Sequence, residues 1–158
     1  MYCARCNSYF ALKRKRMKVP GMVFCSEECL FNFIVCRQNE DLPSWDVGMV
    51  PAKIATPRIY YSPALRRSFR SKLESEFAEH IVEQWKIPMM YEVVMIPVGK
   101  NKWYVPDFFA PKSNIFLEVK GLWHIGAMNK FIKAQKILGE ERLLLIPPEY
   151  FSWFNKKR

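Results

Sequence analysis

The stretch from Pro106 to Trp123 constrains this chain more than any other part of its sequence. It consists of Pro106-Asp107, ten further residues, and then Glu118-Val119-Lys120-Gly121-Leu122-Trp123. Residues 115–120 have the composition of a strand, and side chains on a strand alternate between its two faces. Glu118 and Lys120 are therefore expected on one polar face, with Leu117 and Val119 pointing into a core. Asp107 is expected to join them from the neighbouring strand, across a turn at residues 110–114.

This pattern is typical of a metal site that works on phosphates. Mg²⁺, or Mn²⁺ in its place, accepts one or two carboxylates and keeps its other positions for water and phosphate oxygens. Asp107 and Glu118 would supply those carboxylates. Lys120 can orient or deprotonate the attacking water, or hold a non-bridging oxygen in the transition state. The alternative is a solvated strand face that carries a Glu and a Lys by chance; the adjoining Phe108-Phe109 pair and the two-strand spacing favour the metal site.

The same residues match the PD-(D/E)xK nuclease motif, and the surrounding sequence resembles the phage endonuclease I family of Holliday-junction resolvases. The resemblance covers about residues 66 to 125. Its matching segments fall in the same order with near-equal spacing, and they are Arg70-Ser71-Lys72-Leu73-Glu74, Tyr91-Glu92, Pro106-Asp107-Phe108 and Glu118-Val119-Lys120-Gly121-Leu122-Trp123.

The resemblance implies an α/β fold, with a restriction-endonuclease-like core in which helices flank a central mixed sheet. It implies the catalytic residues Glu74, Asp107, Glu118 and Lys120, with Mg²⁺ held by Glu74, Asp107, Glu118 and the main-chain carbonyl of Val119. It also implies a homodimer. Glu74 has a second interpretation, because Ser71-x-x-Glu74 is also a helix capping box. Glu92 lies on a predicted strand from which it could reach the site, but an exposed strand residue is the favoured interpretation.

Four of the five cysteines form two close pairs, Cys3-x-x-Cys6 and Cys25-x-x-x-Cys29. Such pairs can close a tetrahedral zinc site, and a metal is the first interpretation for cysteines in a reducing compartment. Ser26 is expected to cap a helix with Cys29 on its first turn. The sequence around the second pair resembles a treble-clef finger of the FCS/TRASH/MYM kind, which implies structural zinc. Cys36 is expected to be a small core residue.

The formal charge of +10, from 25 Lys and Arg against 15 Asp and Glu, favours a polyanionic partner, of which nucleic acid is the simplest. The candidate DNA contacts are Lys13, Arg14, Lys15, Arg16 and Lys18 in a basic loop, and His124, Lys130 and Lys133 near the C-terminal helix. Each has a plain alternative. The basic loop can be a solvated finger loop, His124 can lie on the rim of the site, and Lys130 and Lys133 can belong to a solvated helix stripe.

Composition and periodicity divide the chain into a zinc-finger module at 1–38, a Pro-rich linker at 39–63 and a nuclease domain at 64–158. The last is expected to hold a helix at about 71–85, strands at 89–96, 102–105, 115–120 and 142–146, and a helix at 127–138. The sequence contains no run of about 18 apolar residues, so no membrane span is predicted. The N-terminus lacks an apolar signal core. A cytoplasmic location is expected. If the protein is encoded by a phage, this is the cytoplasm of the host cell.

These features predict a Mg²⁺-dependent endonuclease that hydrolyses phosphodiester bonds of branched or duplex DNA. One alternative is a site-specific or nicking endonuclease of the homing or mobile-element type, with the zinc finger used for targeting. The other is a catalytically inactive, zinc-containing DNA-binding adaptor.

Overall fold

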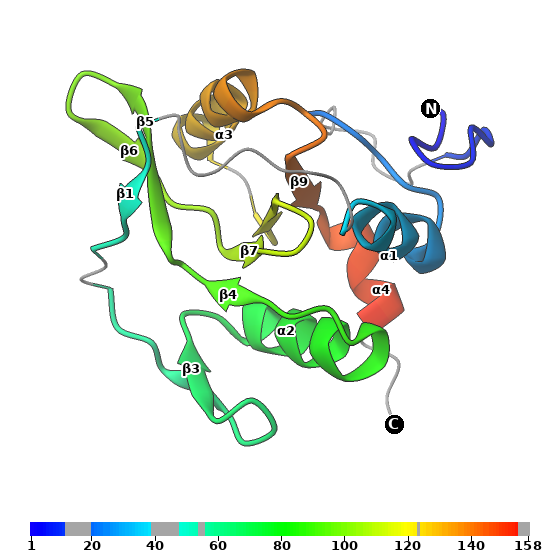
Figure 1. Ribbon diagram of the computed structural model, residues 1–158, viewed down its shortest axis with the longest axis horizontal. Coiled ribbons are helices and arrows are strands. Elements are labelled where there is room, and N and C mark those ends of the chain that lie inside the picture. Colours follow the sequence, from blue (N-terminus) through cyan, green and yellow to red (C-terminus); the bar gives the residue numbers. More distant parts are fainter. Residues whose placement is uncertain (12–19, 39–47, 54–55, 123, 155–158) are drawn as a thin grey trace.

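A four-stranded mixed sheet forms the centre of the computed structural model, which describes residues 1–11, 20–38, 48–53, 56–122 and 124–154 (Figure 1). Its strands are β4 (Met90–Tyr91), β7 (Phe108–Ala110), β8 (Ile115–Val119) and β9 (Leu143–Ile146), in the order β4-β7-β8-β9. β9 is parallel to β8, whereas β7 is antiparallel to both β4 and β8. The predicted mixed sheet and the predicted turn at residues 110–114 are confirmed. The strand predicted before Asp107, at 102–105, lies in a different sheet as β6 (Lys102–Tyr104), and β7, which follows Asp107, was not predicted.

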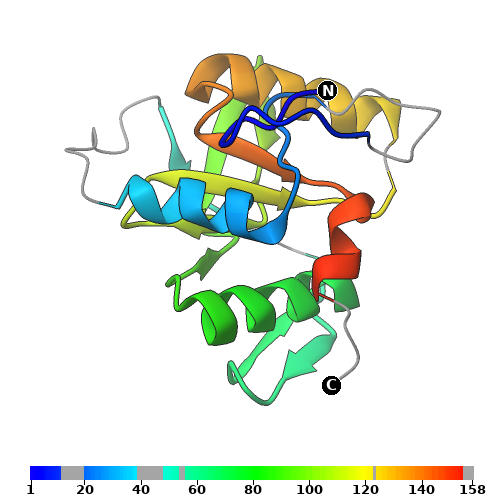
Figure 2. The same ribbon diagram turned by 90° about the vertical axis from the view of Figure 1, so that its right-hand side faces the viewer.

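Helices cover both faces of this sheet (Figure 2). α3 (Ile125–Leu138) packs on one face through Phe131, Ala134 and Leu138, against Phe109 and Phe116. The other face is covered by α1 (Glu27–Cys36), α2 (Lys72–Trp85), the short 3₁₀ helix η1 (Pro148–Tyr150) and α4 (Phe151–Phe154). β8 therefore lies between two apolar layers, and all five of its residues are buried.

The strand predicted at residues 89–96 is wrong as a single element. β4 ends at Tyr91, and β5 (Val94–Gly99) begins a different, three-stranded sheet with β1 (Val50–Pro51) and β6 (Lys102–Tyr104). Glu92 lies between them with φ +48°. A non-glycine residue rarely adopts this left-handed conformation, which turns the chain out of one sheet and into the next.

A two-stranded sheet of β2 (Tyr60–Ser62) and β3 (Arg67–Phe69) precedes α2. It is fastened to that helix by the Ser62 hydroxyl, which donates a hydrogen bond of 2.5 Å to Glu79. The segment predicted as a Pro-rich linker thus contributes the edge strand β1 and, in β2, half of this hairpin, and its Met49 packs against the α3 side of the core.

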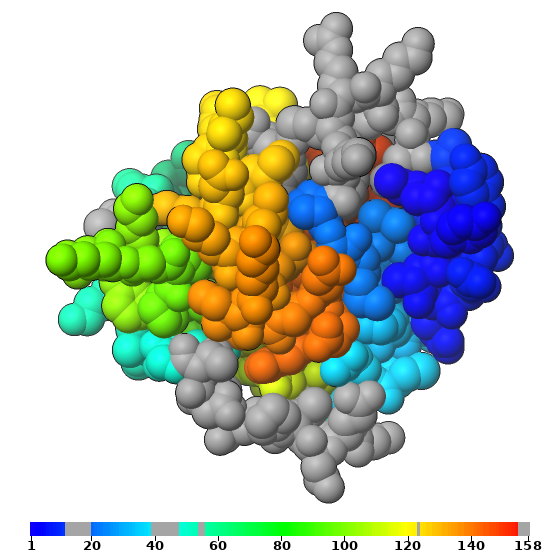
Figure 3. Space-filling view, turned by 90° about the horizontal axis from the view of Figure 1, so that it is seen from above, coloured from blue at the N-terminus to red at the C-terminus, as the bar shows by residue number. Residues whose placement is uncertain are grey.

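The N-terminal cysteine region lies directly against the rest of the molecule. Phe24, Leu30, Phe31 and Ile34 are fully buried in the same apolar cluster as Phe77 of α2. Tyr150 ties the two ends of the chain together, because its hydroxyl accepts a hydrogen bond from the Phe24 N–H at 2.6 Å. Figure 3 shows the face on which the N-terminal residues (blue), α3 (yellow and orange) and the β5–β6 hairpin (green) lie side by side.

Two further expectations concern the chain as a whole. The division into three domains at residues 38 and 63 stays a prediction. Among the described residues, no helix has both the length and the apolar composition that crossing a bilayer requires.

Candidate functional site

Asp107 and Glu118 meet where β7 begins and β8 ends, and both carboxylates are buried, with 1% and 2% of each residue exposed. Asp107 is fixed by its Oδ2 atom, which accepts a hydrogen bond of 2.8 Å from the Val119 N–H. Glu118 is fixed by its Oε1 atom, which lies 2.5 Å from the Lys120 ammonium. The alternation predicted for residues 117–120 is confirmed, since Leu117 and Val119 belong to the apolar cluster on the opposite face.

Each of these two carboxylates also has an oxygen that accepts no well-formed hydrogen bond from the described residues. These oxygens, Asp107 Oδ1 and Glu118 Oε2, are buried. The nearest donors are the buried Tyr104 hydroxyl, which interacts with Glu118, and Arg70 Nη2, which lies 3.6 Å from Asp107 Oδ1. A buried acceptor of this kind costs about 1–3 kcal/mol if it stays unsatisfied, and more if it is charged. Carboxylate oxygens are the donors that a hard divalent cation prefers, and whether these two bind Mg²⁺ stays a prediction.

Burial and neighbouring charges shift the pKa values of both Asp107 and Lys120. Burial, followed by the nearby Glu118 carboxylate, raises the pKa of Asp107 well above its ordinary value. The pKa of Lys120 is lowered by burial, but the carboxylates of Glu118 and Asp107 outweigh that effect and raise it overall. Lys120 is therefore held in its charged form. Of its two predicted roles, holding a phosphate oxygen suits this charge better than deprotonating water.

Glu74 combines a capping contact with a position beside the site. Its N–H donates to Ser71 Oγ at 3.2 Å, and the Ser71 hydroxyl in turn donates to Glu74 Oε1 at 2.7 Å. Its Oε2 atom accepts a hydrogen bond from the Tyr91 hydroxyl. Both oxygens of Glu74 thus accept hydrogen bonds, in contrast to those of Asp107 and Glu118. The Ser71 cap is confirmed, but the Glu74 carboxylate bonds to the Ser71 hydroxyl and not to its N–H as a capping box requires. The metal-ligand role of Glu74 stays a prediction.

Tyr91 connects Glu74 to the start of α2, because its hydroxyl also accepts the Arg70 N–H at 2.9 Å. We expect Tyr91→Phe to lower the free energy of unfolding by about 1–3 kcal/mol, since it leaves a buried carboxylate oxygen and a backbone N–H without partners. Urea denaturation measures this change. Tyr61→Phe is the control, because Tyr61 is an exposed residue of β2; equal stability of the two variants would show that the Tyr91 hydroxyl carries no such contact.

Glu92 is the clearest error of the sequence analysis at this site. It is buried, not exposed, because the bend that ends β4 turns its side chain inward, where it forms ion pairs with Arg58 and Arg70. Arg70 also lies 3.6 Å from Asp107 Oδ1. Sequence reasoning missed both arginines; Arg70 and Glu92 each stand in a segment of the family resemblance, which was the one signal that pointed to them.

The four predicted zinc ligands come together. The Sγ atoms of Cys3, Cys6, Cys25 and Cys29 all lie within 4.8 Å of one another, with 3.5 Å between Cys6 and Cys25 and 3.6 Å between Cys25 and Cys29. Sulfur atoms around a tetrahedral zinc stand roughly 3.8 Å apart, given a Zn–S distance of about 2.3 Å. The cluster can therefore hold a metal ion such as Zn²⁺. Among the described residues, Glu74, Asp107 and Glu118 do not form a second group of this kind.

Local structure explains the convergence of these thiols. Ser26 caps α1 as predicted, accepting the Cys29 N–H at 3.2 Å, so Cys29 lies on the first turn of the helix. Hydrogen bonding to Ser8 lowers the pKa of Cys6 to about 6, whereas burial raises the pKa of Cys25 to about 12. A bound cation would hold all four as thiolates. The prediction for Cys36 is wrong: it is exposed, because its position on α1 faces away from the core, and Arg5 contacts its sulfur at 3.7 Å.

The predicted DNA-contacting residues fall into two groups. Lys13, Arg14, Lys15, Arg16 and Lys18 lie outside the described residues. His124 immediately precedes α3, and Lys130 and Lys133 lie on that helix; all three are exposed. Within the described part of the chain, no hydrogen bond or ion pair joins these three side chains to Asp107 or Glu118. Their role in binding DNA stays a prediction.

No family model matches the sequence, and neither the curated proteins nor the solved structures compared with it include a significant match. What the molecule displays is thus a mixed α/β fold with several sheets, a cluster of four cysteines that can hold a metal, and a buried pair of carboxylates beside a lysine.

Proposed function

We propose that this protein is a Mg²⁺-dependent DNA endonuclease that hydrolyses phosphodiester bonds and acts on branched DNA. The observation that carries the proposal is the pair formed by Asp107 and Glu118. Each carboxylate is buried, is held by one oxygen and leaves the other without a well-formed hydrogen bond from the described residues. The resemblance to the PD-(D/E)xK motif and the formal charge of +10 support the choice of DNA as substrate.

Each residue of the proposed site has a defined part in the reaction. Asp107 and Glu118 would hold the cation, and when bound it supplies Lewis-acid activation of water and neutralises charge on the phosphate. The Val119 N–H keeps the Asp107 carboxylate oriented, since it donates to one of its oxygens. Lys120, charged and 27% exposed at its side chain, donates to a non-bridging phosphate oxygen as negative charge develops there.

A cleavage assay tests this proposal. The zinc-loaded protein is incubated with a four-way DNA junction and with a linear duplex of the same sequence, in Mg²⁺ and in Ca²⁺. We expect paired cuts near the junction in Mg²⁺ and none in Ca²⁺, with Lys120→Ala slowing cleavage about 100-fold. Lys100→Ala, in the exposed turn between β5 and β6, is the matched control.

The other outcomes separate the alternatives. Equal cutting of both substrates would favour a targeted or nicking nuclease, for which the cysteine cluster beside the core is the specific supporting feature. Tight DNA binding without cleavage in Mg²⁺ or Mn²⁺ would contradict the catalytic proposal and favour the inactive adaptor.

A further inference from the structure

Two arginines from separate segments share one buried carboxylate next to the proposed catalytic pair. Arg58, which precedes β2, places Nε and Nη2 at 3.3 Å and 3.2 Å from Glu92 Oε2. Arg70, which follows β3, forms an ion pair with Glu92 Oε1 through its Nη2 atom. The Glu92 side chain itself is inaccessible to solvent.

Both guanidinium groups are held by Glu92, on side chains that stay partly exposed, although Arg70 Nε itself is buried. Arg58 lies over the Tyr91 ring, 5.0 Å from its centroid, and the Arg70 backbone is anchored on the Tyr91 hydroxyl. Their side chains nevertheless remain 38% and 31% exposed. A guanidinium fixed by a carboxylate at one edge still has N–H groups with which to bind a phosphate.

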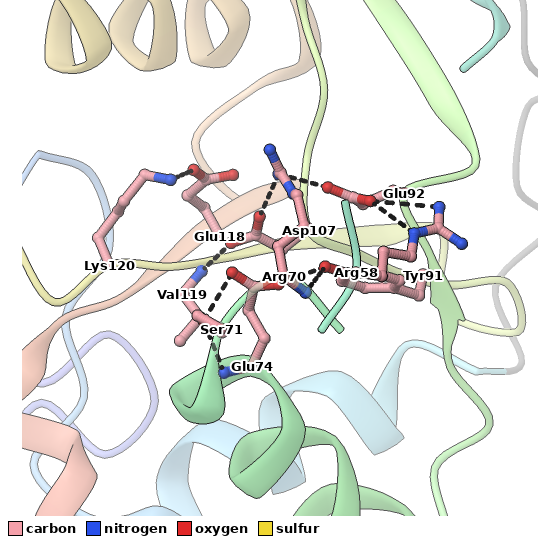
Figure 4. Close-up of polar contacts among 10 residues, drawn as sticks. All are labelled: Arg58, Arg70, Ser71, Glu74, Tyr91, Glu92, Asp107, Glu118, Val119 and Lys120. Atoms are coloured by element: carbon pink, nitrogen blue, oxygen red, sulfur yellow. Dashed lines mark hydrogen bonds and ion pairs between the residues drawn. The ribbon is translucent and has the colours of Figure 1, made fainter. Parts of the chain in front are cut away.

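The arrangement continues the catalytic pair as a row of charges. In Figure 4, Lys120, Glu118, Asp107, Arg70, Glu92 and Arg58 follow one another, so a cation lies on either side of the two metal-binding carboxylates. Arg70 joins the two halves of the row, because its Nη2 atom also lies 3.6 Å from Asp107 Oδ1.

With a divalent cation bound at Asp107 and Glu118, the charge balance of this region would favour an anionic ligand. A single arginine would neutralise Glu92, yet two contact it. Counted with Glu74, the row has four carboxylates against three cations, and one divalent cation at Asp107 and Glu118 makes its net charge positive. A positive site that extends in a line away from the metal suits a polyanionic strand, whose phosphates repeat about every 3.4 Å along the helix axis.

From this geometry we infer that Arg70 and Arg58 form a clamp for two successive phosphates of the strand that is cut. Arg70 contacts the scissile phosphate and Arg58 contacts its neighbour. Glu92 is a positioning residue that holds both guanidinium groups. The inference rests on the proposed nuclease function, and it assigns phosphate-binding roles to residues that the sequence alone did not select.

The test measures binding and cleavage separately with the full-length, zinc-loaded protein. Affinity for the DNA junction is measured in Ca²⁺ at several salt concentrations, and cleavage is measured in Mg²⁺ under single-turnover conditions. We expect Arg70→Gln to slow cleavage about 100-fold, because it removes a charged donor at the reacting phosphate. We expect Arg58→Gln to weaken binding about tenfold and to reduce the salt slope by about one, as the loss of one phosphate contact does.

Glu92→Gln distinguishes positioning from bulk electrostatics. Removing a negative charge should leave DNA affinity unchanged or tighter, while cleavage slows about tenfold because the guanidinium groups are no longer held in place. Arg70→Lys keeps the charge and guards against misfolding of the glutamine variant, and we expect it to slow cleavage as well, since lysine lacks the fork geometry. Lys112→Gln, in the exposed turn at the far end of β7 and β8, is the matched control for loss of one positive charge.

The outcomes keep the two proposals apart. Loss of a contact in the transition state slows a reaction about 100-fold or more. If folded Arg70→Gln and Arg70→Lys variants cleaved within about threefold of the wild type, the clamp would be overturned and the nuclease proposal would stand. Failure of the wild-type protein to cleave any DNA would instead remove the proposed function. An Arg58→Gln variant with an unchanged salt slope would also overturn the clamp.

Discussion

Asp107→Asn is expected to abolish DNA cleavage, by at least about 10⁴-fold, without unfolding the protein. Asparagine has the shape of aspartate and can still accept the Val119 N–H, so the local geometry is preserved. It lacks the negative charge that binds a divalent cation. Single-turnover cleavage of a DNA junction in Mg²⁺ measures the loss, and Glu140→Gln, at an exposed position after α3, is the control.

The same substitution is expected to stabilise the fold in the absence of metal. The folded protein raises the pKa of Asp107, because the side chain is buried and lies near Glu118. The folded state therefore binds this proton more tightly than the unfolded state. Stability conferred by that proton is full below the ordinary aspartate pKa and is lost as the pH rises towards the raised value. At neutral pH the wild type bears this cost, whereas the asparagine variant does not.

We thus expect the asparagine variant to exceed the wild type in free energy of unfolding by roughly 1 kcal/mol or more at neutral pH, and by less in acid. Urea denaturation in EDTA at several pH values measures the difference. Loss of activity together with a gain in stability is the signature of a group kept for function at a cost to folding. A variant that is both inactive and less stable would instead indicate that the Asp107 charge is a structural partner of Lys120 and Arg70.

The four cysteines can hold a metal ion, and we expect its loss to destabilise the whole molecule. Phe24 and Leu30, which adjoin Cys25 and Cys29, are fully buried in the apolar cluster shared with α2 and β8. Releasing the thiols would allow this segment to leave the core. Zinc sites of this kind supply about 10–16 kcal/mol of apparent binding energy in small modules, and even a third of that is large for a domain of this size.

We expect Cys29→Ser to lose stoichiometric zinc and to lower the melting temperature by at least about 10 °C. Metal analysis and thermal unfolding measure the two effects. Cys36→Ser is the matched control, because Cys36 lies on the same helix but is exposed and outside the cluster. If Cys29→Ser melted together with the control, the cysteines would not hold a structural metal.

Sequence periodicity predicted side-chain positions correctly where a single helix or strand determines them. The period of two along a strand places Glu118 and Lys120 on one face and Leu117 and Val119 on the other, and the structure confirms it. Ser26 as a helix cap likewise places Cys29 on the first turn beside Cys25, and the pairing of the four cysteines came from the chemistry of zinc sites. The strand and helix-cap predictions depend on local backbone geometry, which a few neighbouring residues determine.

Contacts between elements were beyond that reasoning. The burial of Glu92 follows from a left-handed bend at which the chain passes from one sheet to another, and periodicity had predicted an unbroken strand there. Cys36 lies on the outer side of α1 because the helix packs through Leu30, Phe31 and Ile34.

By itself, then, the sequence determined which residues share a face of a strand or the first turn of a helix, because bond geometry repeats over a few residues. Only the tertiary structure decided that Arg58 and Arg70 meet at Glu92 beside Asp107. Arg58 and Glu92 are 34 residues apart in the chain. Their contact depends on how separate elements pair and pack, which no local pattern encodes.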